Sequence, residues 1–193
     1  MPANHSVQKA IQLIEGDPTK VLGLKVGSHD NVKPGQYIPK AGEPLIPKNF
    51  ENRRSLTHSD AQFAPKLSFA GLSPSTTYMI VGLDIDAPFP SFGVLGPILH
   101  WIQPGLKASA DNTLNATAPF VANYIGPAPP PGSSPHRYIF FLYEQPAGFD
   151  GTKYAPPNGQ NLGNMQRMRY DLDGWEKQIS LGPILACNYF KSN

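Results

Sequence analysis

The stretch Tyr138-Ile139-Phe140-Phe141-Leu142-Tyr143 decides the fold class of this chain. Aromatic and β-branched residues fill it, and these residue types favour β-strands. A second stretch, Thr76–Asp84, has an apolar centre that predicts a strand buried on both faces. The sequence therefore predicts a mostly β domain built around these two strands.

Three further strands and two helices are predicted on either side of them. The strands are expected over 21–26, over Ile98–Gln103, where Pro104-Gly105 ends the strand, and over Ile184–Phe190. Apolar residues recur every three or four positions over 6–15 and predict a short amphipathic helix. Asp171–Leu181 has the same spacing, with Asp171 as its N-cap.

The composition agrees with a strand-and-loop protein. The 193 residues include 22 Pro and 18 Gly, and Pro is about twice as frequent as its usual share of ~5%. Because Pro breaks helices, a helical bundle is excluded. Hydrophobic residues make up 40% of the chain, which excludes a disordered polypeptide. The length suits one domain, 1–193, with residues 28–62 as long surface connections around an extended piece.

Charge and cysteine content exclude several partners. The net charge is +2 with no basic run, so nucleic acid is not expected as a partner. No apolar stretch is long enough to span a membrane, so we expect peripheral membrane contact at most. The N-terminus lacks a secretory signal, and the single Cys187 has no partner for an internal disulfide. These features predict a cytoplasmic location.

Polar residues that can carry chemistry stand where the predicted strands meet loops. Asp84 and Asp86 end one strand, and strand alternation would point them the same way, so one needs a proton or a partner. His100 lies inside a strand. A Pro-rich loop delivers His136 and Tyr138 on one face of the aromatic strand. Each segment also has a purely structural alternative. Asp84–Pro88 can be a simple turn, and His100 can be a core histidine. The Pro-rich loop can be a rigid connector or a ligand for a proline-binding module.

Familiar catalytic motifs are absent from the sequence. There is no phosphate-binding Gly-x-x-x-x-Gly-Lys, no Gly-x-Ser-x-Gly elbow and no His-Glu-x-x-His. Two Asp and two His could hold a metal in principle, but their spacing does not select a metal over a hydrogen-bonded pocket. We therefore expect no enzyme, no metal and no cofactor. Cys187 is interpreted as a buried packing residue.

Taken together, these segments resemble the phosphatidylethanolamine-binding protein family. Asp84-Ile85-Asp86-Ala87-Pro88 is similar to its Asp-Pro-Asp-x-Pro motif, and His100-Trp101 is similar to a following His. Residues 126–145 resemble its Pro-rich block ending in His-Arg-Tyr. The similarity covers about residues 22–190 and is greatest to the fungal carboxypeptidase Y inhibitor-like branch.

The resemblance implies a β-sandwich with a large central antiparallel sheet, a smaller second sheet and a few short flanking helices. It also implies a small pocket for phosphate or a phosphorylated lipid head group. Carried over by motif, the residues that would line it are Asp84, Asp86, Pro88, His100, Ala128, Pro129, Pro130, His136 and Tyr138.

Two departures from the family pattern change what we expect. Phe89-Pro90-Ser91 follows the first motif where the family has an Arg, so a cation that would brace the loop is missing and the entrance should be more apolar. Inhibitors of this branch use an acetylated N-terminus, and Pro2 is a poor acetylation site.

Three functions are open at this point. The first is a regulator with an anion pocket that modulates a protein kinase or a protease. The second is an inhibitor of a serine carboxypeptidase. The third, a phosphoester hydrolase that uses an Asp–His pair as general acid and base, is the least favoured because no nucleophile stands out.

Overall fold

The computed structural model describes residues 4–39, 60–92 and 94–193. Its strands form one sheet in the order β1-β3-β6-β5-β4-β7-β8-β2. Their bounds are β1 Gly23–Lys25, β2 Gln36–Tyr37, β3 Lys66–Ser68, β4 Tyr78–Asp84, β5 Ile98–Ala108, β6 Thr113–Ala116, β7 His136–Glu144 and β8 Ala186–Ser192. Neighbouring strands are antiparallel, except β2 and β8, which are parallel.

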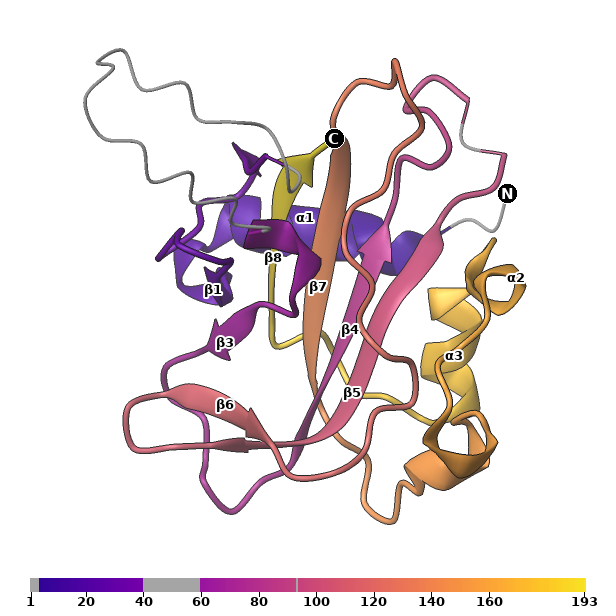
Figure 1. Ribbon diagram of the computed structural model, residues 1–193. Helices are drawn as coiled ribbons and strands as arrows, with labels where there is room; N and C mark the ends of the chain where they lie inside the picture. Colours follow the sequence, from indigo (N-terminus) through magenta and orange to yellow (C-terminus); the bar gives the residue numbers. More distant parts are fainter. Residues whose placement is uncertain (1–3, 40–59, 93) are drawn as a thin grey trace, which may run out of the picture.

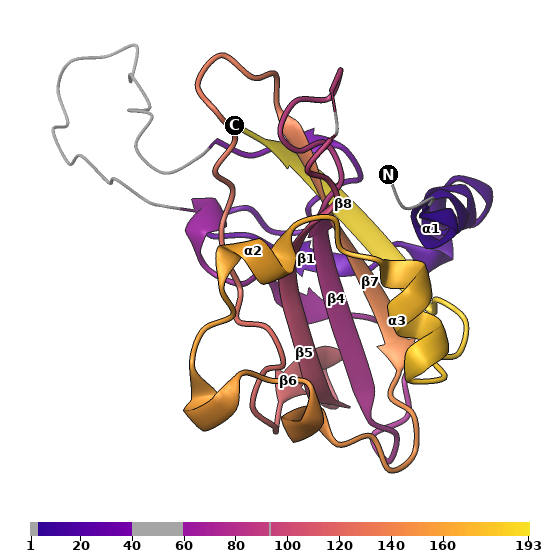
Figure 2. The ribbon, with the colours of Figure 1, turned by 90° about the vertical axis from the view of Figure 1, so that its right-hand side faces the viewer.

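Short helices accompany the sheet. They are α1 His5–Gly16, α2 Asn164–Arg167 and α3 Leu172–Gln178, with 3-10 turns η1 Pro18–Lys20, η2 Asp60–Gln62, η3 Gly151–Lys153 and η4 Pro157–Gly159. Figure 1 shows α1 behind the sheet, and Figure 2 shows α2 near the start of β5 and α3 beside β7. Among the residues that the structure describes, no helix is long and apolar enough to cross a membrane.

The two strands that decide the fold lie side by side in the centre of the sheet. β4 pairs with β7 over its whole length, and every residue of β4 is buried, as its apolar centre predicts. Along β7 alternate side chains enter two cores. Tyr138, Phe140 and Leu142 pack inside the curl of the sheet, and the residues between them pack under α1 and α3.

One predicted strand end is wrong. β5 does not stop at Pro104-Gly105 but continues to Ala108. The register with β4 shifts here, because Leu106 pairs with Tyr78 and Gln103 pairs with Ile80. Gly105 has a positive φ of 69°, which glycine adopts without strain. The dipeptide Pro104-Gly105 therefore bends β5 instead of ending it, and the last residues of β5 form hydrogen bonds with β6.

This bend explains why the predicted second sheet is not confirmed. Over the described ranges the short strands β1, β3 and β6 are joined to the central strands through β5, so they continue one curled sheet. The segment before β1 also reaches the far side of the curl, where the Leu22 amide donates to the Cys187 carbonyl of β8. The fold is mostly β with few helices, as predicted.

The other elements follow the sequence closely, with small shifts. The N-terminal helix is present as α1, and the late helix begins after Asp171, whose side chain accepts from the Gly174 amide. That helix ends at Gln178, earlier than predicted, and Ser180 has a positive φ. β2 is the extended piece expected within 28–62, although 40–59 lie outside the described residues. The short strands β3 and β6 were not predicted.

Candidate functional site: a pocket at the ends of three central strands

Three adjacent strands bring the predicted polar segments together. In the order β5-β4-β7, β4 ends at Asp84, while β5 and β7 begin just before His100 and at His136. Antiparallel pairing places the end of β4 beside the starts of its neighbours, with Asp84 opposite both Ile98 and Tyr138. The sheet topology therefore assembles in space what the sequence separates by some 50 residues.

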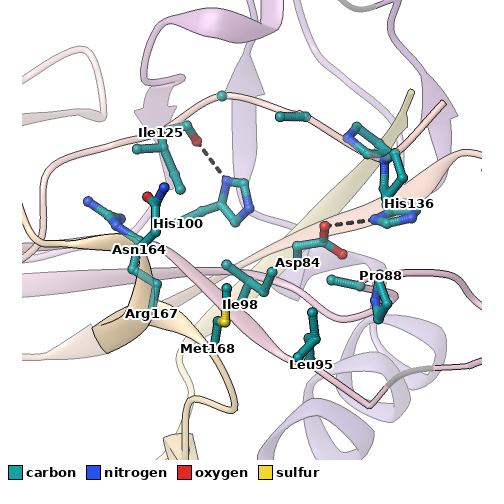
Figure 3. A pocket seen from close by; sticks show the side chains of 15 residues that line it. Asp84, Pro88, Leu95, Ile98, His100, Ile125, His136, Asn164, Arg167 and Met168 are labelled. Carbon is teal, nitrogen blue, oxygen red and sulfur yellow. Dashed lines mark hydrogen bonds and ion pairs between the residues drawn. The ribbon is translucent and has the colours of Figure 1, made fainter.

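A pocket of about 290 Å³ opens at this end of the sheet. Seven of the nine residues that the resemblance implies line it, and their side chains converge in Figure 3. They are Asp84, Pro88, His100, Ala128, Pro129, Pro130 and His136. That these residues bind a ligand remains a prediction.

Asp86 does not line the pocket. Its carboxylate accepts hydrogen bonds from Arg137, two from the guanidinium at 2.8 and 2.6 Å and one from the backbone amide at 2.8 Å. Because β4 ends at Asp84, strand alternation does not continue to Asp86, and the expectation that the two carboxylates face the same way is wrong. Burial acts to raise the pKa of Asp86, but the hydrogen bonds and charge of Arg137 outweigh it and lower this pKa.

Tyr138 lies beneath the pocket rather than on its wall. Its ring is edge-on to the ring of His100 at 5.0 Å and stacks on Phe190 at 5.5 Å. Burial, together with the nearby charge of Asp84, raises the pKa of Tyr138 far above its usual value, so the hydroxyl stays protonated. Tyr138 thus supports His100 from below.

His100 reaches the pocket because it is the extra residue of a β-bulge. Trp101 pairs with Gly82 and Leu99 with Leu83, so His100 has no partner on β4. Its Nδ1 lies 2.7 Å from the Ile125 carbonyl (Figure 3). Burial lowers the pKa of His100, which keeps the ring neutral at pH 7. Nδ1–H is then the donor to Ile125, and Nε2 carries a lone pair.

His136 is held at both ring nitrogens. Nδ1 lies 2.8 Å from Asp84 Oδ2, and Nε2 lies 2.8 Å from Ser133 Oγ. The second oxygen of Asp84 accepts from the Asp86 amide at 2.9 Å. His136 and Asp84 are only 1% and 4% exposed. Both ring nitrogens of His136 are therefore engaged by protein groups.

Arg167 is a charged residue of the pocket that the sequence did not point to. It is 1% exposed, and it donates from Nε to Leu162, from Nη1 to the carbonyls of Leu99 and Asn123, and from Nη2 to Asn123 Oδ1. Four of its five N–H groups are thereby used, and these acceptors are all uncharged. Burial lowers the pKa of Arg167, yet a guanidinium remains charged.

No local signal marks Arg167 in the sequence, because it stands in the polar run Asn164-Met165-Gln166-Arg167. Only the packing of α2 against β5 brings it to the pocket. It supplies a buried cation at the pocket. Phe89 and Phe92, which follow the first motif, are exposed, and an apolar entrance remains a prediction.

The described residues show no metal centre. No three His, Cys, Asp or Glu side chains come together within 4–39, 60–92 and 94–193 in a way that could hold an ion. The pocket instead combines one buried guanidinium, one neutral imidazole and the hydrogen-bonded Asp84 and His136 with apolar walls from Leu95, Ile98 and Met168. This arrangement suits a small anion that carries an apolar or uncharged group.

Comparison with known proteins identifies the family to which this curled sheet belongs. A sequence model described as phosphatidylethanolamine-binding protein matches residues 28–183. The chain therefore belongs to the phosphatidylethanolamine-binding protein family.

Individual relatives place it within that family. It is 26% identical over 192 residues to the carboxypeptidase Y inhibitor of Saccharomyces cerevisiae, which covers 90% of this chain and 84% of the inhibitor. It is 33% identical over 105 residues to the rice protein MOTHER of FT and TFL1 homolog 2, covering 54% and 57% of the two chains.

Solved structures show the same fold. The carboxypeptidase Y inhibitor in complex with its cognate proteinase superposes with a TM-score of 0.68 at 21% identity, covering 100% of this chain and 99% of the other. The phosphatidylethanolamine-binding protein of Plasmodium vivax gives 0.59 at 14% identity, with 89% and 84% covered.

Proposed function

We propose that this chain is a binding and regulatory protein whose pocket takes phosphate or a phosphorylated head group. The observation that carries this proposal is the buried Arg167, which the described residues provide with no carboxylate partner. A buried charge without a counter-charge is costly, and an anion in the pocket would relieve that cost. Its fifth N–H remains for such a ligand.

The neutral His100 indicates which protonation state of the anion the pocket should prefer. Its Nε2 is an acceptor, so the ligand should offer a hydroxyl as well as charged oxygens. A phosphate monoanion or a phosphate monoester with one proton has both. The apolar walls then suit the carbon atoms of a head group.

Titration of inorganic phosphate and phosphoethanolamine into the full chain tests the proposal by calorimetry and thermal denaturation. We expect both ligands to raise the melting temperature by mass action. Arg167→Met should weaken binding at least tenfold, whereas Arg169→Met, an exposed arginine two residues further on, should bind as the wild type does.

A nuclear magnetic resonance titration covers the case in which Arg167→Met does not fold. In the wild-type protein, added phosphate should shift the resonances of the Arg167 side chain and the His100 ring. No shift at millimolar phosphate would refute the anion pocket.

Inhibition of a serine carboxypeptidase is the second candidate. It is favoured by the likeness over nearly the whole chain to the yeast carboxypeptidase Y inhibitor. Titration of purified carboxypeptidase Y with the intact chain and with an N-terminally trimmed chain decides it. Stoichiometric inhibition supports the candidate, and full protease activity at micromolar chain contradicts it. A protein kinase as the regulated partner remains a prediction from the resemblance.

A further inference from the structure

Ser133, His136 and Asp84 form a continuous hydrogen-bonded line beside the pocket. Ser133 Oγ lies 2.8 Å from His136 Nε2, and His136 Nδ1 lies 2.8 Å from Asp84 Oδ2. Figure 3 shows the second of these contacts at the pocket wall. The sequence suggests no nucleophile here, because Ser133 follows Gly132 in a Pro-rich loop and not in a strand-to-helix elbow.

We propose that Ser133 is an acyl-accepting nucleophile, activated by His136 and Asp84, that reacts with small activated esters. A Ser–His–carboxylate unit is recognised by its geometry, since the order of its members along the chain differs between unrelated folds. Here the order is Asp, Ser, His. Both contacts lie within the distance over which a base can take a proton from a nucleophile.

Burial and orientation support this assignment. The imidazole and the carboxylate are almost fully buried, whereas Ser133 is partly exposed, so a substrate can reach the hydroxyl while the base is shielded. The Asp86 amide holds Oδ1 of Asp84, which leaves Oδ2 for Nδ1–H of His136. That contact selects the tautomer in which Nε2 carries the lone pair.

The loop also fixes the position of Ser133. The Ser133 amide donates to the Pro130 carbonyl at 3.1 Å, and Gly132 has a positive φ of 82° that allows this turn. The Ser134 carbonyl, 2.9 Å from Ser133 Oγ, is a second acceptor for the hydroxyl proton at rest. The hydroxyl proton of Ser133 can therefore go either to His136 Nε2 or to the Ser134 carbonyl, and transfer to Nε2 requires that the second hydrogen bond is not made.

The reaction needs no cofactor. Ser133 Oγ forms a bond to the ester carbonyl carbon while its proton passes to His136 Nε2. The bond from that carbon to the alcohol oxygen breaks, and the departing alcohol takes the proton from Nε2. Water then adds to the acyl group with His136 as base, which releases a carboxylic acid and restores the serine. The adjacent cavity of about 290 Å³, with apolar walls, sets the substrate class as esters of short acids.

Incubation of the full chain with p-nitrophenyl acetate tests the proposal. We expect release of nitrophenolate and, in samples quenched with acid during turnover, one acetyl group that peptide mass spectrometry locates on Ser133. Ser133→Ala should remove this adduct, whereas Ser134→Ala, a change of the neighbouring exposed serine, should leave it in place. His136→Gln should slow acylation by about 10²–10⁴-fold, the range for loss of a general base.

An acetyl group found only on lysines or tyrosines, or equal rates of nitrophenolate release in wild type and Ser133→Ala, would overturn the proposal. Ser133→Ala changes a partly exposed loop residue, so its fold is checked by its melting temperature. Phosphate titration of the same variant separates the two functions, because loss of the nucleophile should leave phosphate binding unchanged.

Discussion

At the scale of single residues, the two aspartates of one motif have different roles. Asp84 binds His136 at the pocket, and Asp86 binds Arg137 outside it. The difference follows from the end of β4 at Asp84, after which the chain turns. Each carboxylate therefore has its own cationic or hydrogen-bonding partner, and neither needs to share a proton with the other.

Replacing Asp86 by Asn should lower the free energy of unfolding at pH 7 by about 1–3 kcal/mol, as expected for hydrogen bonds to a charged group. Because its pKa is lowered in the folded protein, Asp86 stabilises fully above the unfolded value of about 4. That stabilisation is lost as the pH falls through the lower folded pKa. Urea denaturation of both proteins should thus give a smaller difference at about pH 3 than at pH 7.

The matched control for Asp86 is Asp30→Asn. Asp30 pairs with Lys25 at 2.6 Å at the surface, where an ion pair is worth about 0–1 kcal/mol. Equal effects of the two substitutions at pH 7 would contradict the account of Asp86.

His100 should make stability depend on pH in the neutral range. Its folded pKa is lowered by burial, so between that value and about 6.5 the unfolded chain binds a proton that the folded chain does not. Stability therefore decreases as the pH falls below about 6.5. In His100→Gln, denaturation midpoints measured from pH 7 to 5 should fall less steeply than in the wild type, and an equal slope in the two proteins would contradict this role of His100.

At the scale of elements, α1 is capped by a residue of α3. Asn4 makes no side-chain cap to α1. Instead Asp173 accepts from the amides of His5 and Ser6, at 2.8 and 2.9 Å, and also from the Ser6 hydroxyl. These hydrogen bonds, with Ser6 also bonded to Glu176, fasten the N-terminal helix to α3.

Loss of this cap should loosen α1 without unfolding the sheet. Asp173→Ala is expected to cost about 0.5–2 kcal/mol, the usual range for an N-cap. Hydrogen exchange followed by mass spectrometry should show faster exchange of the α1 amides and unchanged exchange in β4 and β7. Asp111→Ala is the control, because it removes a carboxylate that accepts from the Thr113 amide in a turn outside α1, and it should leave the exchange of the α1 amides unchanged. Unchanged protection of α1 in Asp173→Ala would contradict the role of Asp173.

At the scale of the whole molecule, the sheet and α1 enclose Cys187. Its Sγ–H donates to the Ala10 carbonyl of α1 at 3.1 Å, and burial raises its pKa to about 12. We expect no reaction with DTNB at pH 8 in the folded protein and one thiol per chain in concentrated urea, because only the thiolate reacts. Ser134→Cys provides an exposed thiol as control, and it should react at once. Rapid labelling of the wild type would mean that α1 opens readily.

The elements that the sequence predicted best are those whose local residue pattern favours a single type of secondary structure. β4 and β7 consist of strand-forming apolar residues, and α3 carries its own cap at Asp171. The short strands β3 and β6 have three and four residues and no such pattern. Pro104-Gly105 predicts a strand end because both residues favour turns. The sequence does not show that β5 bends there and continues by pairing with β6.

The sequence by itself determined the class of fold, the family and seven of the residues that line the pocket, because these follow from strand-forming residues and from short motifs within the chain. Tertiary structure alone decided that Arg167 enters the pocket, that Asp86 leaves it and that Ser133 meets His136. The physical reason is that hydrogen bonds and charge partners form between side chains that pairing, bulges and turns bring within about 3 Å, and residue order does not specify those distances.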